Sequence, residues 1–229
     1  MAKKIMIVKD GPYLVTGDID LSIEAIVPNE EGYSATYEKG KKFPSDKEYS
    51  LCRCGKSKNM PYCDGSHRDG NFDGTETASR KDFFESAEKM KGPDITLYDE
   101  GSLCAYARFC DRPRRAWAMA SNPKNEEETK RAIEEACDCP SGRLVAVDNR
   151  TNEIYEPKLK KEITLLEDPA LDISGPLYVK GGIQVEAADG HKYEIRNRQT
   201  LCRCGESSNK PFCDGTHASC KFRDNLSNE

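Results

Sequence analysis

The chain has 229 residues and a formal net charge of −5, with 33% charged and 36% hydrophobic residues. This acidic balance argues against a nucleic-acid-binding protein, which would carry an excess of basic residues. The length suits two or three small modules, each with a thin apolar core of the kind that metals commonly brace.

No apolar run approaches the roughly 20 residues that a membrane-spanning helix needs. The N-terminal stretch has only the short apolar run Ile5 to Val8, whereas a secretory signal needs roughly 7–15 such residues. We therefore expect a soluble, cytoplasmic protein that does not bind a membrane.

The N-terminal part of the chain is predicted to be rich in β-strands. A turn at Gly11-Pro12 precedes a short apolar run, and residues 19–23 alternate between apolar and polar side chains. A further strand is predicted between Tyr33 and Tyr37. These strands would lead into the cysteine motif that follows.

Residues 52–67 contain three cysteines and one histidine at the spacing C-x-C-x8-C-x3-H. Three thiolates and one imidazole in a short loop indicate a metal site rather than a catalytic dyad. The candidate ligands are Cys52, Cys54, Cys63 and His67.

Residues 76–93 are predicted to be a polar linker. A short helix is expected around Phe83, Phe84, Ala87 and Met90, and Gly92-Pro93 marks a boundary.

The next segment is predicted to contain a longer helix. Asn122 would cap it, Pro123 would take the first position, and the helix would run to about Ala136. Its buried stripe would consist of Ala132, Ile133 and Ala136, and a strand is expected at residues 144–147.

Three cysteines of this segment form a second kind of pattern. Cys104 and Cys110 are spaced C-x5-C, and Cys139 is followed by proline. Ala107 occupies the place that a central cysteine takes in ferredoxins of the C-x2-C-x2-C type.

The first motif returns at residues 202–217, with Cys202, Cys204, Cys213 and His217 at the same spacing. A turn at Gly175-Pro176 repeats Gly11-Pro12, and the alternation in residues 192–196 predicts a strand. An internal repeat implies a pseudo-symmetric arrangement within one chain. Ten of the eleven cysteines lie in the three clusters, which favours metal sites over a disulfide scaffold.

The repeated sixteen-residue motif resembles that of the CDGSH iron–sulfur proteins. The resemblance implies that each set of three cysteines and one histidine holds a [2Fe-2S] cluster. Residues 95–154 resemble the divergent single-cluster ferredoxin domains, which share the C-x5-C start, a basic stretch with tryptophan (Arg114-Arg115-Ala116-Trp117) and a Cys-Pro-Ser-Gly end.

Several neighbours of the ligands are expected to tune these sites. Ser57 and Ser207 could donate hydrogen bonds to cluster sulfur. Asp64 and Asp214 would either cap the helix that carries the histidine, which we favour, or orient the ligands. The arginines between the paired cysteines, Arg53 and Arg203, are expected to sit on the outside of the protein and to carry local charge.

The nuclearity of the middle centre stays open at this point. The thiolates of Cys104, Cys110 and Cys139 suit a [3Fe-4S] cluster, whereas a fourth ligand, for which Cys137 is the nearest candidate, would allow [4Fe-4S]. The alternatives are a middle domain with no cluster and, for the repeated motifs, structural zinc. Zinc is disfavoured because its paired cysteines are usually separated by two or more residues.

The predicted fold class is α+β, with two small β-rich CDGSH modules forming an intramolecular pseudo-dimer and a ferredoxin-like domain inserted between them. The predicted units are residues 1–75, the linker 76–93, the ferredoxin-like domain 94–160, and residues 161–229. We expect a monomer with internal pseudo-symmetry.

No fingerprint of a hydrolase, phosphate-binding or nicotinamide- or flavin-binding site is present. The expected function is one-electron transfer, or storage and transfer of clusters, with a redox protein or an apo-protein acceptor as partner. The alternatives are a redox or iron sensor and a zinc-stapled interaction module. A role as the electron-input subunit of a larger enzyme also stays open.

Overall fold

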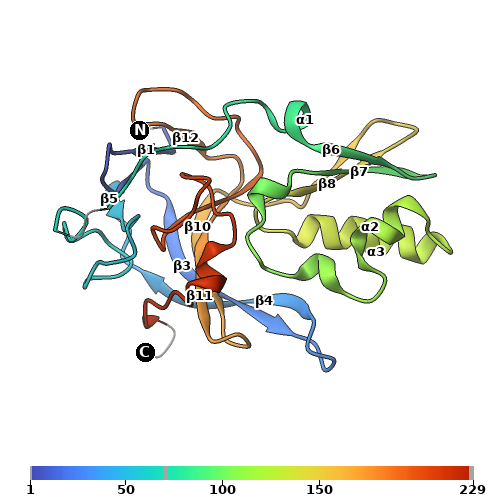
Figure 1. Cartoon of the computed structure of the whole chain (residues 1–229), viewed down its shortest axis with the longest axis horizontal. Helices are drawn as coiled ribbons and strands as arrows, with labels where there is room; N and C mark the ends of the chain where they lie inside the picture. Colours follow the sequence, from blue (N-terminus) through green and yellow to red (C-terminus); the bar gives the residue numbers. More distant parts are fainter. Residues whose placement is uncertain (1, 70–71, 227–229) are drawn as a thin grey trace.

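The computed structural model describes residues 2–69 and 72–226. The described residues form three β-sheets and four short or medium helices, which is a mixed α+β architecture. Figure 1 shows two parts side by side: the sheets built from both ends of the chain, and the middle segment with its two main helices.

The first sheet is made mainly by the N-terminal part of the chain. Its order is β12-β1-β2-β5, and its strands span Lys4–Ile7 (β1), Tyr13–Thr16 (β2), Glu48–Leu51 (β5) and Gln184–Glu186 (β12). Strand β12 comes from the C-terminal part and pairs in parallel with β1.

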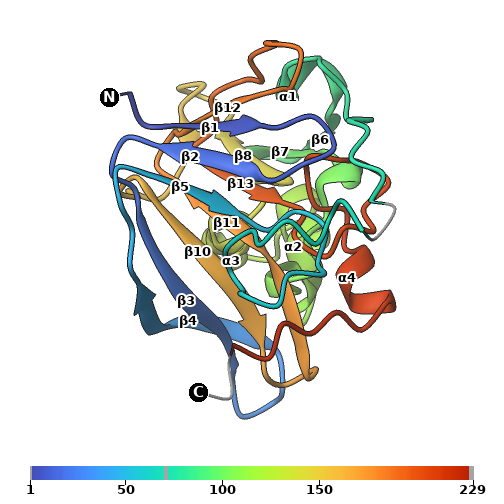
Figure 2. The ribbon, with the colours of Figure 1, turned by 90° about the vertical axis from the view of Figure 1, so that its left-hand side faces the viewer.

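The second sheet shows the reverse arrangement. Its order is β13-β11-β10-β3-β4, and its strands span Arg198–Leu201 (β13), Ile173–Lys180 (β11), Glu162–Asp168 (β10), Asp20–Pro28 (β3) and Ser34–Phe43 (β4). Here β3 of the N-terminal part pairs in parallel with β10 of the C-terminal part. Each end of the chain therefore lends a strand to the sheet of the other (Figure 2).

A single apolar core lies between these two sheets. It is supplied by alternate residues of the strands, because successive side chains in a strand point to opposite faces. Its buried members include Ile5, Tyr13, Val15, Leu21, Leu51, Ile163, Leu165, Leu177, Val179, Val185 and Leu201.

The middle segment has its own sheet and core. The antiparallel sheet β6-β7-β8-β9 spans Glu88–Lys91, Ile95–Asp99, Leu144–Asp148 and Ile154–Tyr155, and helices α2 (Arg115–Ser121) and α3 (Glu126–Asp138) pack against it. The core is built from small and branched side chains: Ile95, Leu97, Ala116, Met119, Ala120, Ala132, Ala136, Leu144 and Ala146. The short helices α1 (Phe83–Ser86) and α4 (Thr216–Ser219) lie outside this domain core, as do the 3-10 turns Gly101–Leu103 and Phe109–Asp111.

The strands predicted at residues 19–23, 33–37 and 144–147 are confirmed by β3, β4 and β8. The predicted start of the long helix is wrong, because Asn125 caps α3 by accepting a hydrogen bond from the Glu128 amide at 3.0 Å. Asn122 instead ends the preceding helix α2.

Two other local predictions need correction. The helix at Phe83 ends at Ser86, and residues 88–91 form strand β6 of the middle sheet. Residues 192–196 form one bridge at Lys192 rather than a strand, and Ile195 is 60% exposed, so the alternation there does not reflect a buried face. No helix among the described residues is both long and apolar enough to span a bilayer.

Candidate metal centres

The first cysteine loop follows directly from strand β5 and presents its predicted ligands in two pairs. The sulfurs of Cys52 and Cys54 lie 3.8 Å apart, and Cys63 Sγ lies 3.5 Å from His67 Nδ1. A tetrahedral metal with metal–sulfur bonds of about 2.3 Å holds two thiolates roughly 3.8 Å apart. Each pair is therefore spaced to hold one metal ion.

The second loop, which follows strand β13, repeats this geometry. Cys202 Sγ lies 3.7 Å from Cys204 Sγ, and Cys213 Sγ lies 3.3 Å from His217 Nδ1. Among the described residues no three such side chains converge on one point, and the candidate ligands come as pairs. Pairs suit a two-iron cluster, in which each iron takes two protein ligands, one pair here containing the imidazole.

Aspartates close both loops. Asp64 accepts hydrogen bonds from the amides of Lys58 (2.8 Å) and Ser66 (3.0 Å), and Asp214 does the same with Ser208 (2.8 Å) and Thr216 (3.0 Å). The Ser66 side chain, followed by the amides of Ser66 and Lys58, holds the pKa of Asp64 well below its usual range. These carboxylates tie the start of the loop to the segment that carries the histidine. The predicted capping role is wrong, because Gly215 is the N-cap of α4 and no side chain caps it, while His67 lies in a turn rather than in a helix.

The serines have a different role from the predicted one. Ser57 Oγ donates to the Tyr62 carbonyl at 2.6 Å, and Ser207 Oγ donates to the Phe212 carbonyl at 2.7 Å. Each hydroxyl proton is therefore used to hold the loop rather than to reach a cluster sulfur.

The first thiol of each motif is the more acidic of its pair. The neighbouring Cys54 thiol, followed by the amides of Ser57 and Gly55, lowers the pKa of Cys52, although burial opposes this. Cys202 is affected in the same way by Cys204 and the amides of Ser207 and Gly205. A thiolate, not a thiol, is the metal ligand, so these donors prepare the site for metal.

The prediction that Arg53 and Arg203 lie outside is wrong: they are only 1% and 2% exposed. The hydrogen bonds described for Arg53 go to the carbonyls of Gly11, Gly74 and Val8. Burial is possible because these oxygens satisfy the guanidinium, as a buried polar group requires.

Arg203 is held differently. Besides the carbonyls of Gly175 and Leu166, it pairs with Glu167 at 2.5 Å and with Asp224, both buried carboxylates. The cation next to the second loop is therefore paired with two buried carboxylates, whereas the hydrogen bonds described for Arg53 go to carbonyls.

The two loops interlock through their glycines. A Cβ added at Gly55 would lie 2.4 Å from the Cys204 carbonyl oxygen, and one added at Gly205 would lie 2.6 Å from that of Cys54. Both glycines have positive φ, 72° and 87°, so only glycine fits this close crossing without strain. The backbones of the two candidate sites are thus in direct contact.

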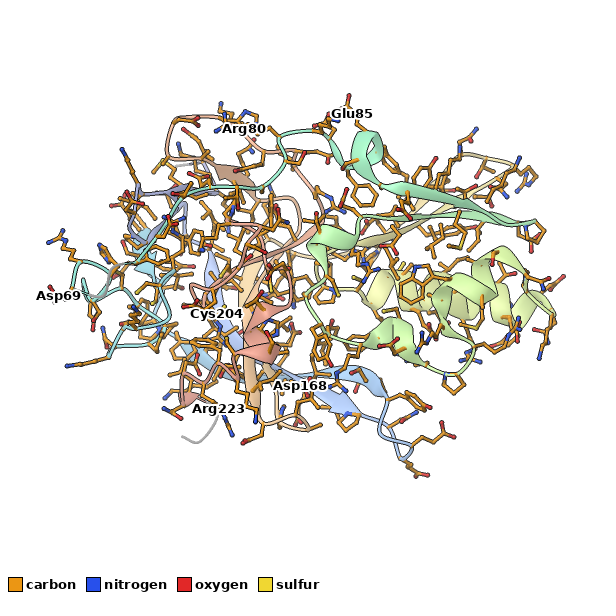
Figure 3. The ribbon with its side chains drawn as sticks, viewed as in Figure 1. Asp69, Arg80, Glu85, Asp168, Cys204 and Arg223 are labelled. Carbon is orange, nitrogen blue, oxygen red and sulfur yellow. The ribbon has the colours of Figure 1, made fainter. Side chains whose placement is uncertain are left out.

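The outer ends of the two loops differ in exposure. Cys63 and His67 are half-buried and line an open groove with Asp10, Arg68 and other residues, whereas Cys213 and His217 are each 3% exposed. Burial, with the Arg203 guanidinium adding to it, lowers the pKa of His217 to about 4. In Figure 3, Asp69 next to the first loop lies at the edge of the molecule, while Cys204 lies in its interior.

The middle segment brings its three predicted ligands together. Cys104, Cys110 and Cys139 line one cavity, and Ala107 lines it as well. Burial raises the pKa of Cys110 to about 12, as expected for a thiol in an apolar site. Cys137 does not line this cavity, and its sulfur lies 3.6 Å from the Tyr155 carbonyl.

The loop that carries Cys139 is held by an arginine that sequence reasoning missed. Arg198, 1% exposed in strand β13, donates to the carbonyls of Ala136 (2.6 Å), Cys137 (3.0 Å) and Cys139 (2.8 Å). Glu156 compensates its charge at 2.8 Å. A signal was present, because the corresponding position four residues ahead of the first cysteine in the other copy is Glu48.

Comparisons with protein families agree with this arrangement. A family described as an iron-binding zinc finger of CDGSH type matches residues 10–68 and 174–218, and a family described as a divergent 4Fe-4S mono-cluster matches residues 90–149. Neither the curated proteins nor the solved structures contain a match to the chain. The chain is therefore a tandem CDGSH iron–sulfur protein with a divergent mono-cluster domain inserted between its two CDGSH regions.

Proposed function

We propose that the chain carries three iron–sulfur clusters and acts in one-electron transfer, or in the storage and transfer of clusters. The main support is that each CDGSH loop presents two pairs of candidate ligands. In one pair the two cysteine sulfurs lie 3.7–3.8 Å apart, and in the other a cysteine sulfur lies 3.3–3.5 Å from the imidazole Nδ1. A cluster bound there would exchange single electrons, which these side chains cannot do alone.

The proposed ligands of the two [2Fe-2S] clusters are Cys52, Cys54, Cys63 and His67 in the first loop and Cys202, Cys204, Cys213 and His217 in the second. The reciprocal exchange of β3 and β12 between the sheets supports an intramolecular pseudo-dimer. We expect the working unit to be a monomer.

For the middle domain we propose a [3Fe-4S] cluster on Cys104, Cys110 and Cys139. The family description names a four-iron cluster, but here Ala107 stands in the cavity and Cys137 faces Tyr155. These placements leave three thiolates for the cluster. A four-iron cluster would need a ligand from elsewhere for its fourth iron.

Both uses of the clusters have support in the first loop. His67 is half-buried beside an open groove, which suits either electron exchange with a redox protein or release of the cluster to an apo-protein acceptor. The unit boundaries proposed are 1–75, 94–160 and 161–229, joined by residues 76–93, of which 88–91 form strand β6 of the middle sheet.

The test is iron, sulfide and zinc analysis with EPR on anaerobically purified protein, before and after dithionite. We expect about seven irons per chain, from clusters of two, two and three irons, with a [3Fe-4S] signal in the oxidised state. Zinc in place of iron would contradict the proposal and favour a stapled interaction module. Four irons would restrict it to the CDGSH loops.

A further inference from the structure

We propose that the two CDGSH sites have separate roles: the His217 site is the internal electron partner of the middle centre, and the His67 site is the one that faces an external partner. The inference rests on the proposed function and adds the order in which the three centres exchange electrons. Exchange within the chain moves one electron from one centre to the other, with no proton or atom transferred.

The first support is a close contact between the second CDGSH loop and the middle domain. A Cβ added at Gly215 would lie 3.0 Å from the Cys104 carbonyl oxygen and 3.5 Å from Tyr106 Cβ. Gly215 lies between Cys213 and His217, and Cys104 is a candidate ligand of the middle centre. The backbone of Cys104, a candidate ligand of the middle centre, therefore packs against the second CDGSH loop at a point between Cys213 and His217.

Polar contacts hold the same two segments in place. Asn209, inside the second loop, donates to the Ser102 carbonyl at 2.9 Å, just ahead of Cys104. Arg198, in the strand that leads into that loop, donates to the Cys139 carbonyl at 2.8 Å. The second CDGSH module thus contacts the middle site on both sides, next to Cys104 and at Cys139.

The first loop lacks this cover. A Cβ added at Gly65, the counterpart of Gly215, meets no atom of the described residues within 4 Å. The first loop contacts the second loop where their backbones cross: Gly55 lies against Cys204, and Gly205 lies against Cys54. The contacts therefore run in one order: middle site, second loop, first loop.

The difference in burial fits that order. A reduced cluster needs access to a partner only at the end of the series, and electron exchange inside the chain benefits from exclusion of water. His217 and Cys213 are each 3% exposed, whereas His67 and Cys63 line the open groove.

The experiment uses EPR of the dithionite-reduced full chain, with the His67→Cys and His217→Cys variants assigning the two [2Fe-2S] signals. The spin relaxation of each signal is then measured in the wild type and in Cys110→Ser, which removes a middle ligand that is not among the atoms nearest to Gly215. We expect the His217-site signal to relax several-fold more slowly when the middle centre is lost, and the His67-site signal to change less.

Two further measurements remain informative if Cys110→Ser does not fold. A gadolinium chelate in solution should broaden the His67-site signal of the wild type first. Gly215→Ala should alter the spectrum of the middle centre, while Gly65→Ala should not. The two glycines form a matched pair because their φ angles are 88° and 92°, so backbone strain is equal and only one Cβ meets the middle domain.

The inference would be overturned if all three clusters were present and the His67-site signal responded more strongly to loss of the middle centre. It would also be overturned if gadolinium broadened the His217-site signal first, or if both glycine variants had the same effect. Absence of iron would instead overturn the proposed function itself.

Discussion

The two CDGSH loops carry the same ligand types at the same spacing and nearly the same atomic distances, yet their surroundings are opposite. His67 lies beside an open groove, while His217 is 3% exposed. The buried cation next to the first loop contacts carbonyls, and the one next to the second contacts two carboxylates. A sequence motif thus specifies the ligand set, whereas the rest of the fold specifies how that set behaves.

The largest expected effect concerns the buried arginines. Arg203→Met would leave Glu167 and Asp224 buried without their cation, which costs about 3–5 kcal/mol of folding free energy. Arg53→Met would leave only carbonyls unsatisfied, at about 1–3 kcal/mol. Thermal and urea unfolding of the two variants measures the difference, and equal destabilisation would remove the electrostatic distinction between the loops.

The next largest effect concerns the pH at which each CDGSH loop loses its cluster. Binding requires an unprotonated imidazole nitrogen, and burial lowers the pKa of His217 to about 4, so its neutral form persists as the pH falls. The first loop lies beside an open groove, whereas Cys213 and His217 are each 3% exposed. We expect the first cluster to be lost at higher pH than the second, as measured by EPR of the assigned signals, and simultaneous loss would argue against this account.

The reduction potentials of the two CDGSH clusters should also differ. Reduction adds negative charge, which burial and nearby carboxylates disfavour. We therefore expect the cluster of the first loop to have the higher potential in an EPR-monitored titration. His67→Cys and His217→Cys should each lower the potential of the altered site, because an anionic ligand replaces a neutral one. A higher potential at the His217 site would contradict the assignment.

The smallest expected effect tests whether the serines Ser57 and Ser207 stabilise their loops or change the reduction potential of the clusters. Ser57→Ala and Ser207→Ala each remove a hydrogen bond to a carbonyl, worth about 1 kcal/mol, and the loss should be larger at Ser207, which is 2% exposed. Potentials should change little in either variant. A clear shift in potential with unchanged stability would restore the role predicted from sequence.

Local spacing made the candidate ligands accessible to sequence reasoning, because each motif is short and contiguous. The parallel pairing of Lys4 with Gln184 was not accessible, since register between strands so far apart follows from tertiary packing. The burial of Arg53 was missed for the same reason: its partners Gly11 and Gly74 lie 42 and 21 residues away.

The errors at helix ends have a different origin. Asn122 and Asn125 are both good capping residues, and the choice between them depends on helix α2, which ends at Ser121 and takes Asn122 as its own cap. Cys137 and Cys139 are similarly close in sequence, and only the fold shows that Cys139 faces the cavity while Cys137 faces Tyr155.

The most direct test of the account is an anomalous diffraction map at the iron edge, from anaerobically grown crystals of the full chain. The account predicts iron at three places: between the ligand pairs of the exposed first loop, between those of the buried second loop, and in the cavity of Cys104, Cys110 and Cys139 without a bond to Cys137. Single zinc ions in the two loops, or a middle cluster bound by Cys137, would contradict it.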